Sequence, residues 1–302
     1  MIAIIDYDAG NIRSVENALI ALGEEVVITR DPEILLQAEK VILPGVGAFG
    51  DAMEKLHAYG LVDVIHQIVK KKTPFLGICL GLQLLFDEAV KDAMIIDKDE
   101  ILPVVSLDEG EPYAVYDDEG RILLYTFHKY PDSYPDGADV KLEWGNVWTF
   151  TGGELEEKYQ ENKDSVTDWQ TRLKELIGLR PDNESNYFTA MWVKPEDVFR
   201  PAYVSDIGTV EMTDSFSEDV NEEYKAWFDD NIISSYFDGA YPWTRLGYTY
   251  DWADNGQEYG LSEFIVKKDS NIKVAYTVEL DEMLKKLEND SWNPQAENSK
   301  NS

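Results

Sequence analysis

The chain has 302 residues, with 27 basic and 59 acidic side chains and a formal net charge of −32. This charge excludes nucleic acid and an anionic membrane as partners, because both carry negative phosphates. The single cysteine excludes an internal disulfide and a cysteine-rich zinc site, and no run of apolar residues is long enough to span a membrane. The first residues lack the pattern of a signal peptide, so we expect a cytoplasmic protein. No metal or cofactor is expected.

The composition changes near residue 90. Residues 1–90 carry 7 basic and 13 acidic side chains, a net charge of −6, whereas residues 91–302 carry 20 and 46, a net charge of −26. All eight tryptophans lie after residue 140, and 15 of the 17 tyrosines lie after residue 90. Because two stretches of one domain rarely differ this much, we predict a boundary at about residue 91. An acidic, aromatic-rich domain is then expected over 91–288, and a flexible polar tail over 289–302.

The first stretch alternates short apolar runs with segments of helical periodicity. The apolar runs predict strands at residues 2–5, 26–28, 40–43 and 74–78. The periodic segments predict helices at residues 11–22, from Pro32 onward, at 48–71 with a break at Gly60, and at 79–86. Apolar strands that alternate with helices predict an open, doubly wound parallel sheet of the flavodoxin-like α/β class. Ligands of such sheets bind beyond the carboxyl ends of the strands.

The second stretch does not continue this alternation. Strands are predicted at residues 122–127, 140–150, 262–266 and 272–278, and helices at 154–162, 166–177 and 279–287. Between the second helix and the third strand, aromatic segments are divided by prolines. This order predicts an α+β domain.

Cys79 lies between a predicted strand and a predicted helix, within Gly77-Ile-Cys-Leu-Gly81. The arrangement is that of a nucleophile elbow with cysteine in place of serine. The sharp turn exposes the side chain over the sheet edge, and the N-terminus of the helix favours a thiolate and offers N–H groups to an oxyanion. A lone cysteine is more often a small buried apolar side chain, but the flanking glycines favour the nucleophile.

A second loop, Pro44-Gly45-Val46-Gly47, follows another strand of the predicted sheet. Parallel strands end at the same edge of a sheet, so backbone amides of this loop are expected to face the thiol. An ordinary connecting turn is the alternative. Together the two loops predict a thiol opposite an oxyanion hole, a geometry that suits acyl transfer from an amide.

Four blocks of the sequence, residues 1–7, 10–16, 43–53 and 76–86, closely resemble the class I glutamine amidotransferases. Within that family the resemblance is to the glutaminase subunits of imidazole glycerol phosphate synthases, which act in histidine biosynthesis. The resemblance implies an enzyme that is classed both as a hydrolase and as a lyase. The resemblance covers residues 1–90 only. One departure is Asp8-Ala9, where the family usually has Gly-Met.

The resemblance implies the roles of several residues. Cys79 would be the nucleophile that forms a thioester with L-glutamine. The residues that would bind the substrate and its oxyanion are Gly45, Val46, Gly47, Leu80 and Gln83. The ammonia would pass to a cyclase subunit, with which the chain would form a heterodimer.

The histidine that activates the cysteine in this family is followed by proline and glutamate, and this pattern is missing here. The three histidines are His57, His66 and His128. The first two lie in a predicted helix, where solvated side chains are expected. His128 stands in Phe127-His-Lys-Tyr-Pro131, without an adjacent proline or the glutamate. A thiol without a base keeps its ordinary pKa of about 8.5 and attacks amides poorly. We therefore predict an incomplete triad and slow glutamine hydrolysis.

Residues 91–302 resemble an uncharacterised domain of Firmicutes proteins, through segments at 164–169, 176–179, 199–203 and 241–256. Their tyrosines and tryptophans could line a sugar- or peptide-binding cleft, although an aromatic core is the commoner use. The segment from Asp251 to Gly256 suggests calcium, but its spacing misses the Asp-x-Asp-x-Asn-Gly pattern. The alternative to an enzyme is a non-enzymatic chimeric or truncated protein whose C-terminal domain is a binding or surface module.

Overall fold

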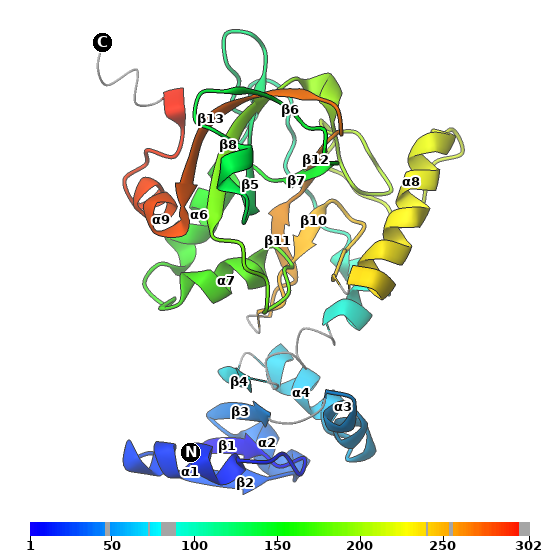
Figure 1. Cartoon of the computed structure of the whole chain (residues 1–302). Helices are drawn as coiled ribbons and strands as arrows, with labels where there is room; N and C mark the ends of the chain where they lie inside the picture. Colours follow the sequence, from blue (N-terminus) through cyan, green and yellow to red (C-terminus); the bar gives the residue numbers. More distant parts are fainter. Residues whose placement is uncertain (46–48, 72, 80–88, 240, 254–255, 296–302) are drawn as a thin grey trace. The chain divides into compact units, whose positions relative to one another are not determined.

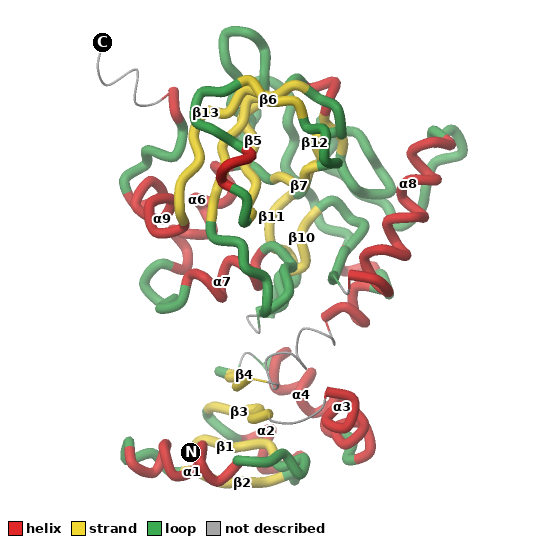
Figure 2. The backbone as a smooth tube through the Cα atoms, viewed as in Figure 1, coloured by secondary structure: helices red, strands yellow, loops and turns green. Residues whose placement is uncertain are grey.

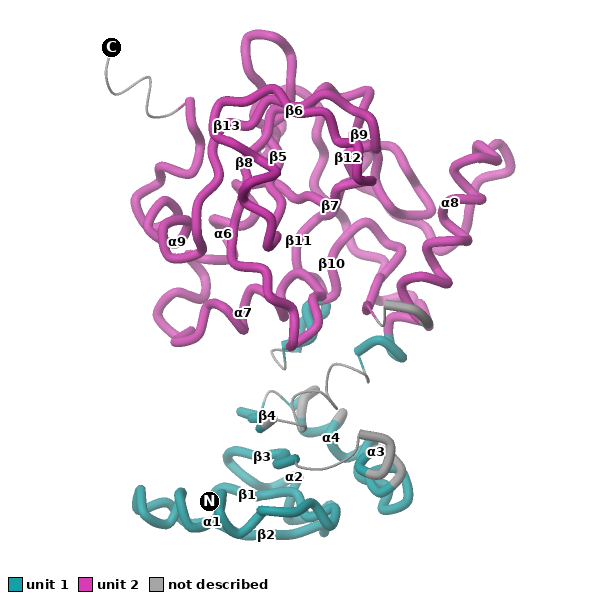
Figure 3. The backbone as a smooth tube through the Cα atoms, viewed as in Figure 1, with its two compact units in different colours: residues 1–92, 251–258 teal, residues 93–250, 259–302 magenta. Residues whose placement is uncertain are grey.

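The structure is a computed structural model that describes residues 1–45, 49–71, 73–79, 89–239, 241–253 and 256–295 (Figure 1). The chain divides into two compact units (Figure 3). The first contains Met1–Asp92 and Asp251–Glu258, and the second contains Ala93–Tyr250 and Tyr259–Ser302. Every helix among the described residues is too short or too polar to cross a lipid bilayer.

The first unit is a parallel sheet whose strands alternate with helices along the chain (Figure 2). Its strands are β1 (Ile2–Ile5), β2 (Val26–Thr29), β3 (Lys40–Gly45) and β4 (Phe75–Cys79). Its helices are α1 (Ile12–Ala21), α2 (Pro32–Gln37), α3 (Phe49–Ala58) and α4 (Leu61–Lys70). The strand order is β2-β1-β3-β4 and every pair is parallel, so the predicted doubly wound α/β fold is confirmed. The helix predicted at 79–86 lies outside the described residues, apart from its first residue.

Local signals explain where these helices begin and end. Asp31 caps α2, because its side chain accepts a hydrogen bond from the N–H of Glu33 at 2.9 Å, and Pro32 occupies the first helical position. Gly60 separates α3 from α4 with a φ of 64°, a left-handed conformation that glycine adopts at little cost. The helix break predicted at Gly60 is therefore confirmed.

Both faces of the parallel sheet are buried. Ala3 and Ile5 of β1 point to a core formed with α2, α3 and α4, whereas Ile2 and Ile4 point to a smaller core formed with α1. Neighbouring residues of a strand face opposite sides, so a continuous apolar strand is needed to fill both cores. The polar side chains near the strands therefore lie mainly in the loops at the strand ends.

The second unit is built from antiparallel sheets and helices (Figure 2). Its strands are β5 (Ile122–His128), β6 (Asp139–Lys141), β7 (Val147–Thr149), β8 (Tyr187–Val193), β9 (Val198–Phe199), β10 (Tyr248–Tyr250), β11 (Tyr259–Ser262), β12 (Phe264–Val266) and β13 (Asn271–Glu279). Its helices are α6 (Gly152–Asn162), α7 (Trp169–Leu176), α8 (Glu222–Ile233) and α9 (Leu280–Glu288). The sheets have the orders β5-β8-β13-β6, β7-β12-β9 and β10-β11, and all their pairs are antiparallel. The predicted α+β class is confirmed.

The sheet β5-β8-β13-β6 forms the middle layer of the second unit. On one face, Leu123 and Phe188 pack against side chains of α6, α7 and α9, which lie together on that side of the strands in Figure 1. On the other face, Leu124 and Met191 pack against side chains of the sheet β7-β12-β9. Because both faces are covered, β5 and β8 are apolar at almost every position.

Three features of the second unit differ from the prediction. The strand predicted at 140–150 is two short strands, β6 and β7, which belong to different sheets. The central strand β8, the short strands β9 and β10, and the helix α8 were not predicted at all. The predicted flexible tail begins too early, because residues 289–295 are described and Trp292 is buried in the core with α9. The carbonyl of Trp292 accepts hydrogen bonds from the hydroxyls of Tyr125 and Tyr276.

Candidate functional site

The carboxyl edge of the parallel sheet places β3 and β4 side by side at their last residues. Gly45 and Cys79 are partners in the register of this strand pair, and Pro44 is the partner of Ile78. The two predicted loops therefore leave the sheet from adjacent positions. This edge is where ligands of open parallel sheets bind.

Most of the predicted site residues lie outside the part of the chain that the structure describes. These are Val46, Gly47, Leu80 and Gln83. Gly45 and the backbone of Cys79 are described, but the Cys79 side chain is not. The oxyanion hole, the glutamine contact and the orientation of the thiol thus stay predictions.

Tyr7 contacts the start of the predicted oxyanion loop. Its hydroxyl donates a hydrogen bond to the carbonyl oxygen of Pro44 at 2.6 Å, and its side chain is 1% exposed. Burial raises the pKa of Tyr7 to about 12, so the hydroxyl keeps its proton at neutral pH. The sequence analysis did not identify this residue, because nothing in the sequence indicates that the two segments touch.

A polar cluster occupies the same edge, where β1 and β2 end. The guanidinium of Arg30 binds Asp6 at 3.0 Å and Asp8 at 2.6 Å, and it stacks over the ring of Tyr59. The Tyr59 hydroxyl also donates to the Asp8 carboxylate, and this bond, followed by that from Arg30, lowers the pKa of Asp8. Asp8 has a φ of 61°, a left-handed conformation. At the position where the chain departs from the amidotransferase pattern, Asp8 is thus held by neighbouring charges.

The structure describes the side chains of two of the three histidines, His57 and His128. His57 is exposed in the last turn of α3, and the side chain of His66 lies outside the described part. His128 lies at the end of β5 in the second unit. Its Nδ1 accepts a hydrogen bond from the N–H of Tyr130 at 3.0 Å, so Nε2 carries the proton and donates to Thr189 Oγ1 at 2.7 Å.

The hydrogen bonds of His128 have a structural use. Thr189 bonds in turn to Thr277 on the neighbouring strand, and Thr277 donates to the carbonyl of Tyr134. Burial lowers the pKa of His128 to about 4, which keeps the ring neutral. The lone pair that a general base needs is already occupied by Tyr130.

The second unit also buries charged groups that sequence analysis missed. Arg200 is 0% exposed, and its guanidinium donates to backbone carbonyls rather than to a carboxylate. The acceptors are the carbonyls of Val105, Asp206, Ile207, Thr209 and Gly247. Burial lowers the pKa of Arg200 to about 10. Gly247 leaves room for the Arg200 side chain, because a Cβ added at position 247 would lie 2.6 Å from Arg200. Nothing in the sequence connects these two positions.

Two carboxylic acids are buried in the same unit. Glu154, in the first turn of α6, accepts hydrogen bonds from the Tyr259 hydroxyl and from the N–H of Ser262, both at 2.7 Å. Burial raises the pKa of Glu154 to about 7. Glu263 accepts a hydrogen bond from the indole of Trp243 at 3.1 Å, and burial raises its pKa well above the usual range. The hydrogen bonds of these groups join a helix, strands and loops of the second unit.

A cavity of about 310 Å³ lies elsewhere in the second unit, at the start of α7 and α9. Its lining residues are Thr167, Asp168, Trp169, Gln170, Asn186, Glu279, Leu280, Asp281 and Leu284. The three carboxylates only accept hydrogen bonds when ionised, so the lining favours a ligand rich in donors. The volume is at the lower end of the range for small-molecule pockets.

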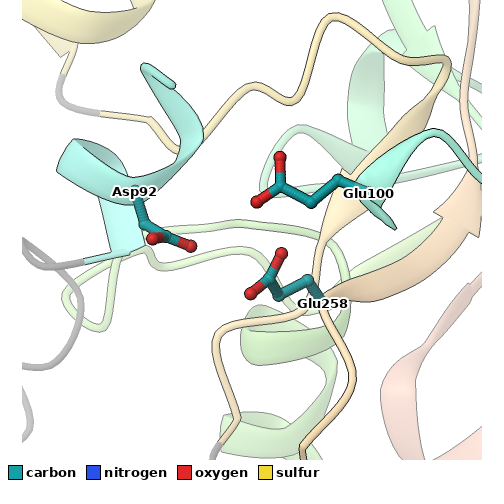
Figure 4. Close-up of side chains that lie close together, drawn as sticks. All are labelled: Asp92, Glu100 and Glu258. Atoms are coloured by element: carbon teal, nitrogen blue, oxygen red, sulfur yellow. The ribbon is translucent and has the colours of Figure 1, made fainter. Parts of the chain in front are cut away.

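Figure 4 shows the acidic side chains of Asp92, Glu100 and Glu258. Asp92 and Glu258 belong to the first unit and Glu100 to the second. Neither unit holds all three, so we assign no metal-ligand set to them.

Comparison with known proteins places the similarity at the N-terminal end. Residues 3–130 match the family "Glutamine amidotransferase class-I". The chain is 52% identical over 90 residues to "Imidazole glycerol phosphate synthase subunit HisH" of Geobacter metallireducens, which is 30% of this chain and 43% of that protein. It is 40% identical over 119 residues to the HisH subunit of Wolinella succinogenes, which is 38% of this chain and 58% of that protein.

A solved structure, the glutaminase domain of Trypanosoma brucei CTPS with bound acivicin, is 12% identical, with a TM-score of 0.24 over 78% of this chain and 93% of that chain. At this score the likeness carries no argument about the fold. The sequence relatives are more informative, but the chain spans only 43% and 58% of the two named above. The class I glutamine amidotransferase family is thus matched by the N-terminal segment of this chain, over less than half of its length.

Proposed function

We propose that the first unit binds L-glutamine and hydrolyses its side-chain amide through Cys79. The observation that carries the proposal is the position of Cys79 at the carboxyl end of β4, in register with Gly45, within a segment that matches the amidotransferase family. The thiolate sulfur would attack the amide carbon and form a tetrahedral oxyanion. Ammonia would leave with a proton taken from water, and a second water molecule would hydrolyse the thioester to glutamate.

The relatives suggest where the ammonia would go. They are named as subunits of imidazole glycerol phosphate synthase, so we propose a cytoplasmic role in histidine biosynthesis, with a cyclase subunit as the partner in a heterodimer. The chain spans about half of the relatives' length, so formation of the heterodimer has to be measured separately from glutamine hydrolysis. Addition of the cyclase subunit should raise glutamate release if the two proteins form a complex.

We propose further that residues 1–90 are a partial amidotransferase domain and residues 91–288 a separate acidic domain. The division of the structure into two compact units supports this, although residues 251–258 are grouped with the first unit. None of the three histidines is followed by the proline and glutamate of the family, and both ring nitrogens of His128 are engaged. General-base catalysis typically raises the rate of a reaction by about a hundred- to ten-thousand-fold. Glutamine turnover should therefore be slower by about that factor than in an amidotransferase with a complete triad.

The test is glutamate release at saturating glutamine, from the intact chain and from Cys79→Ala. We expect slow release that disappears in Cys79→Ala and that rises with pH toward 9, because an unassisted thiol ionises near pH 8.5. Fast release at pH 7 that depends on Cys79 would show that a base exists and that the triad is complete. Equal background rates for both proteins would refute the glutaminase.

The second candidate is a binding role for the acidic unit. The cavity of about 310 Å³ supports it, because Trp169 and three carboxylates line it. Cellobiose and putrescine are suitable probes, as both are rich in hydrogen-bond donors and only putrescine is cationic. A rise in Tm with either probe that is lost in Asp281→Asn would support this role, and an unchanged Tm with both would exclude these two classes of ligand.

A further inference from the structure

The strand β2 leaves backbone groups without a partner on one side. It is the outermost strand in the order β2-β1-β3-β4, and among the described residues it pairs only with β1 (Figure 1). The carbonyls of Glu25 and Thr29 accept hydrogen bonds from β1, at 2.8 and 2.9 Å. Because the hydrogen-bonding groups of a strand alternate between its two sides, the N–H and C=O groups of Val26 and Ile28 point away from β1. They form an open edge to which another strand can add.

The side chains around this edge do not protect it. Exposed edges are usually blocked by charged side chains or by proline, and β2 itself, Val26–Thr29, contains neither. The segment that leads into β2 exposes two large apolar side chains, Ile20 at 57% and Leu22 at 78%. The first unit thus presents apolar side chains directly before an unpaired strand.

The residues at the two ends of β2 carry opposite charges, Glu24 before the strand and Arg30 after it. In an antiparallel pair of two β2 strands, the outward backbone groups are satisfied when Val26 of one copy lies opposite Ile28 of the other. The same register places Glu24 opposite Arg30 at both ends, and Val27 opposite itself at the two-fold axis. Opposite charges that face each other directly stabilise a strand pair, and the symmetry supplies this pair twice.

Both charged groups have capacity for this contact. The Glu24 side chain is exposed and forms no hydrogen bond or ion pair with the described residues. The ion pairs of Arg30 with Asp6 and Asp8 both use Nη2, and a guanidinium has further N–H donors. Residues 1–90 also carry only −6 of the net charge of −32, so contact at this edge joins the less acidic parts of two chains.

We infer that β2 is a self-association surface, at which two copies of the chain form an antiparallel β2–β2 pair. The two parallel sheets then become one continuous sheet. A second copy on this edge lies beside the sheet and not at the carboxyl ends of its strands, so the edge where ligands bind stays open. The inference does not depend on glutamine hydrolysis.

Light scattering after size-exclusion chromatography of the intact chain measures the association. We expect a mass that rises with concentration toward twice the chain mass of 34.4 kDa. A mass that stays at that of one chain between about 1 and 100 µM would overturn the inference.

The variants Glu24→Lys and Glu25→Lys test which surface is used. They make the same charge change at neighbouring exposed positions, but only Glu24 faces Arg30 of the second copy, whereas Glu25 faces Thr29. Glu24→Lys should raise the dissociation constant of the dimer by about tenfold or more, because two attractions become repulsions. Glu25→Lys should change it by less than about threefold. Equal effects of the two variants would contradict the proposed pairing.

A disulfide test in a Cys79→Ala background reports on the register itself. In a pair centred on Val27 the two Cα atoms of this residue are about 4.5 Å apart, within the range for a disulfide. Val27→Cys should therefore cross-link into dimers under oxidation by copper phenanthroline. Thr29→Cys, on the same face of β2, faces Glu25 of the second copy and should stay monomeric on a non-reducing gel. Cross-linking of both variants to the same extent, or of neither, would overturn the inference.

Discussion

In the first unit a parallel sheet buries apolar side chains on both faces, whereas the second unit places charged side chains between its layers. Except for Asp251, every buried polar or charged side chain among the described residues belongs to the second unit. In the first unit, the cluster of Arg30, Asp6, Asp8 and Tyr59 lies at the carboxyl edge of the sheet, which is where ligands of this fold bind. The second unit uses buried hydrogen bonds to join its sheets and helices. Charged side chains therefore lie at an accessible edge of the sheet in the first unit, and between the layers of the fold in the second.

The strongest test of this difference is Arg200→Met. The change leaves the carbonyls that Arg200 now satisfies without a donor in a buried position. We expect the free energy of unfolding of the second unit to fall by about 3–5 kcal/mol. Tryptophan fluorescence in a urea titration measures it, because seven of the eight tryptophans belong to this unit.

The control for this variant is Arg180→Met, since Arg180 is partly exposed and pairs with Asp182 at the surface. Its effect should stay within about 1 kcal/mol, the usual range for surface ion pairs. Alkylation of Cys79 during the same titration reports on the first unit. A loss of stability in the first unit as large as that in the second would contradict the proposed division of roles.

A smaller effect is expected from the pH dependence of Glu154. Its folded pKa of about 7 is above the usual value of 4.5, so the folded chain holds the proton more tightly than the unfolded chain. The stability that Glu154 contributes is complete below pH 4.5 and is lost as the pH rises through 7. Relative to wild type, Glu154→Gln should gain about 3 kcal/mol between these pH values, because glutamine mimics the protonated acid. Urea titrations at pH 5 and pH 8 measure the gain, and a constant difference would contradict it.

His128 should give the opposite slope. Its folded pKa of about 4 is below the usual 6.5, so the unfolded chain takes up the proton first as the pH falls. The stability from His128 is complete above pH 6.5 and is lost as the pH falls to 4. His128→Asn, which retains an acceptor for Tyr130, should therefore lose stability relative to wild type as the pH rises through this range. Parallel pH profiles for wild type and variant would show that the ring is not buried as the structure has it.

The smallest effect is expected from Asp8→Gly, which restores the usual residue of the amidotransferases. Glycine relieves the left-handed φ of 61°, and the variant loses ion pairs that lie at the surface. The two changes oppose each other, so the urea midpoint of the first unit, followed by Cys79 alkylation, should stay close to that of wild type. A large drop would show that this polar cluster supports the first unit as buried charges support the second.

Strands were easier to predict from the sequence in the first unit than in the second. In the first unit, every predicted strand is found within two residues of its predicted ends, because a strand buried on both faces in a parallel sheet is a short apolar run between turns. In the second unit, β8 was missed although it is the second strand of the larger sheet. Its sequence, Tyr187–Val193, is aromatic or apolar at every position except Thr189, since alternate side chains enter two different cores. Neither a helical nor an alternating pattern results.

The sequence by itself determined the α/β class of the first unit, the position of Cys79 at the end of a strand, and the missing histidine motif, since each depends on residues that are close together in the chain. Only the tertiary structure showed that Tyr7 bonds to Pro44, 37 residues away, and that Arg200 is buried among carbonyls from several segments. It also showed that both ring nitrogens of His128 are occupied. The physical reason is the range of the interactions: periodicity and turn chemistry act between neighbours in sequence, whereas the satisfaction of a buried polar group depends on whichever segment folding brings next to it.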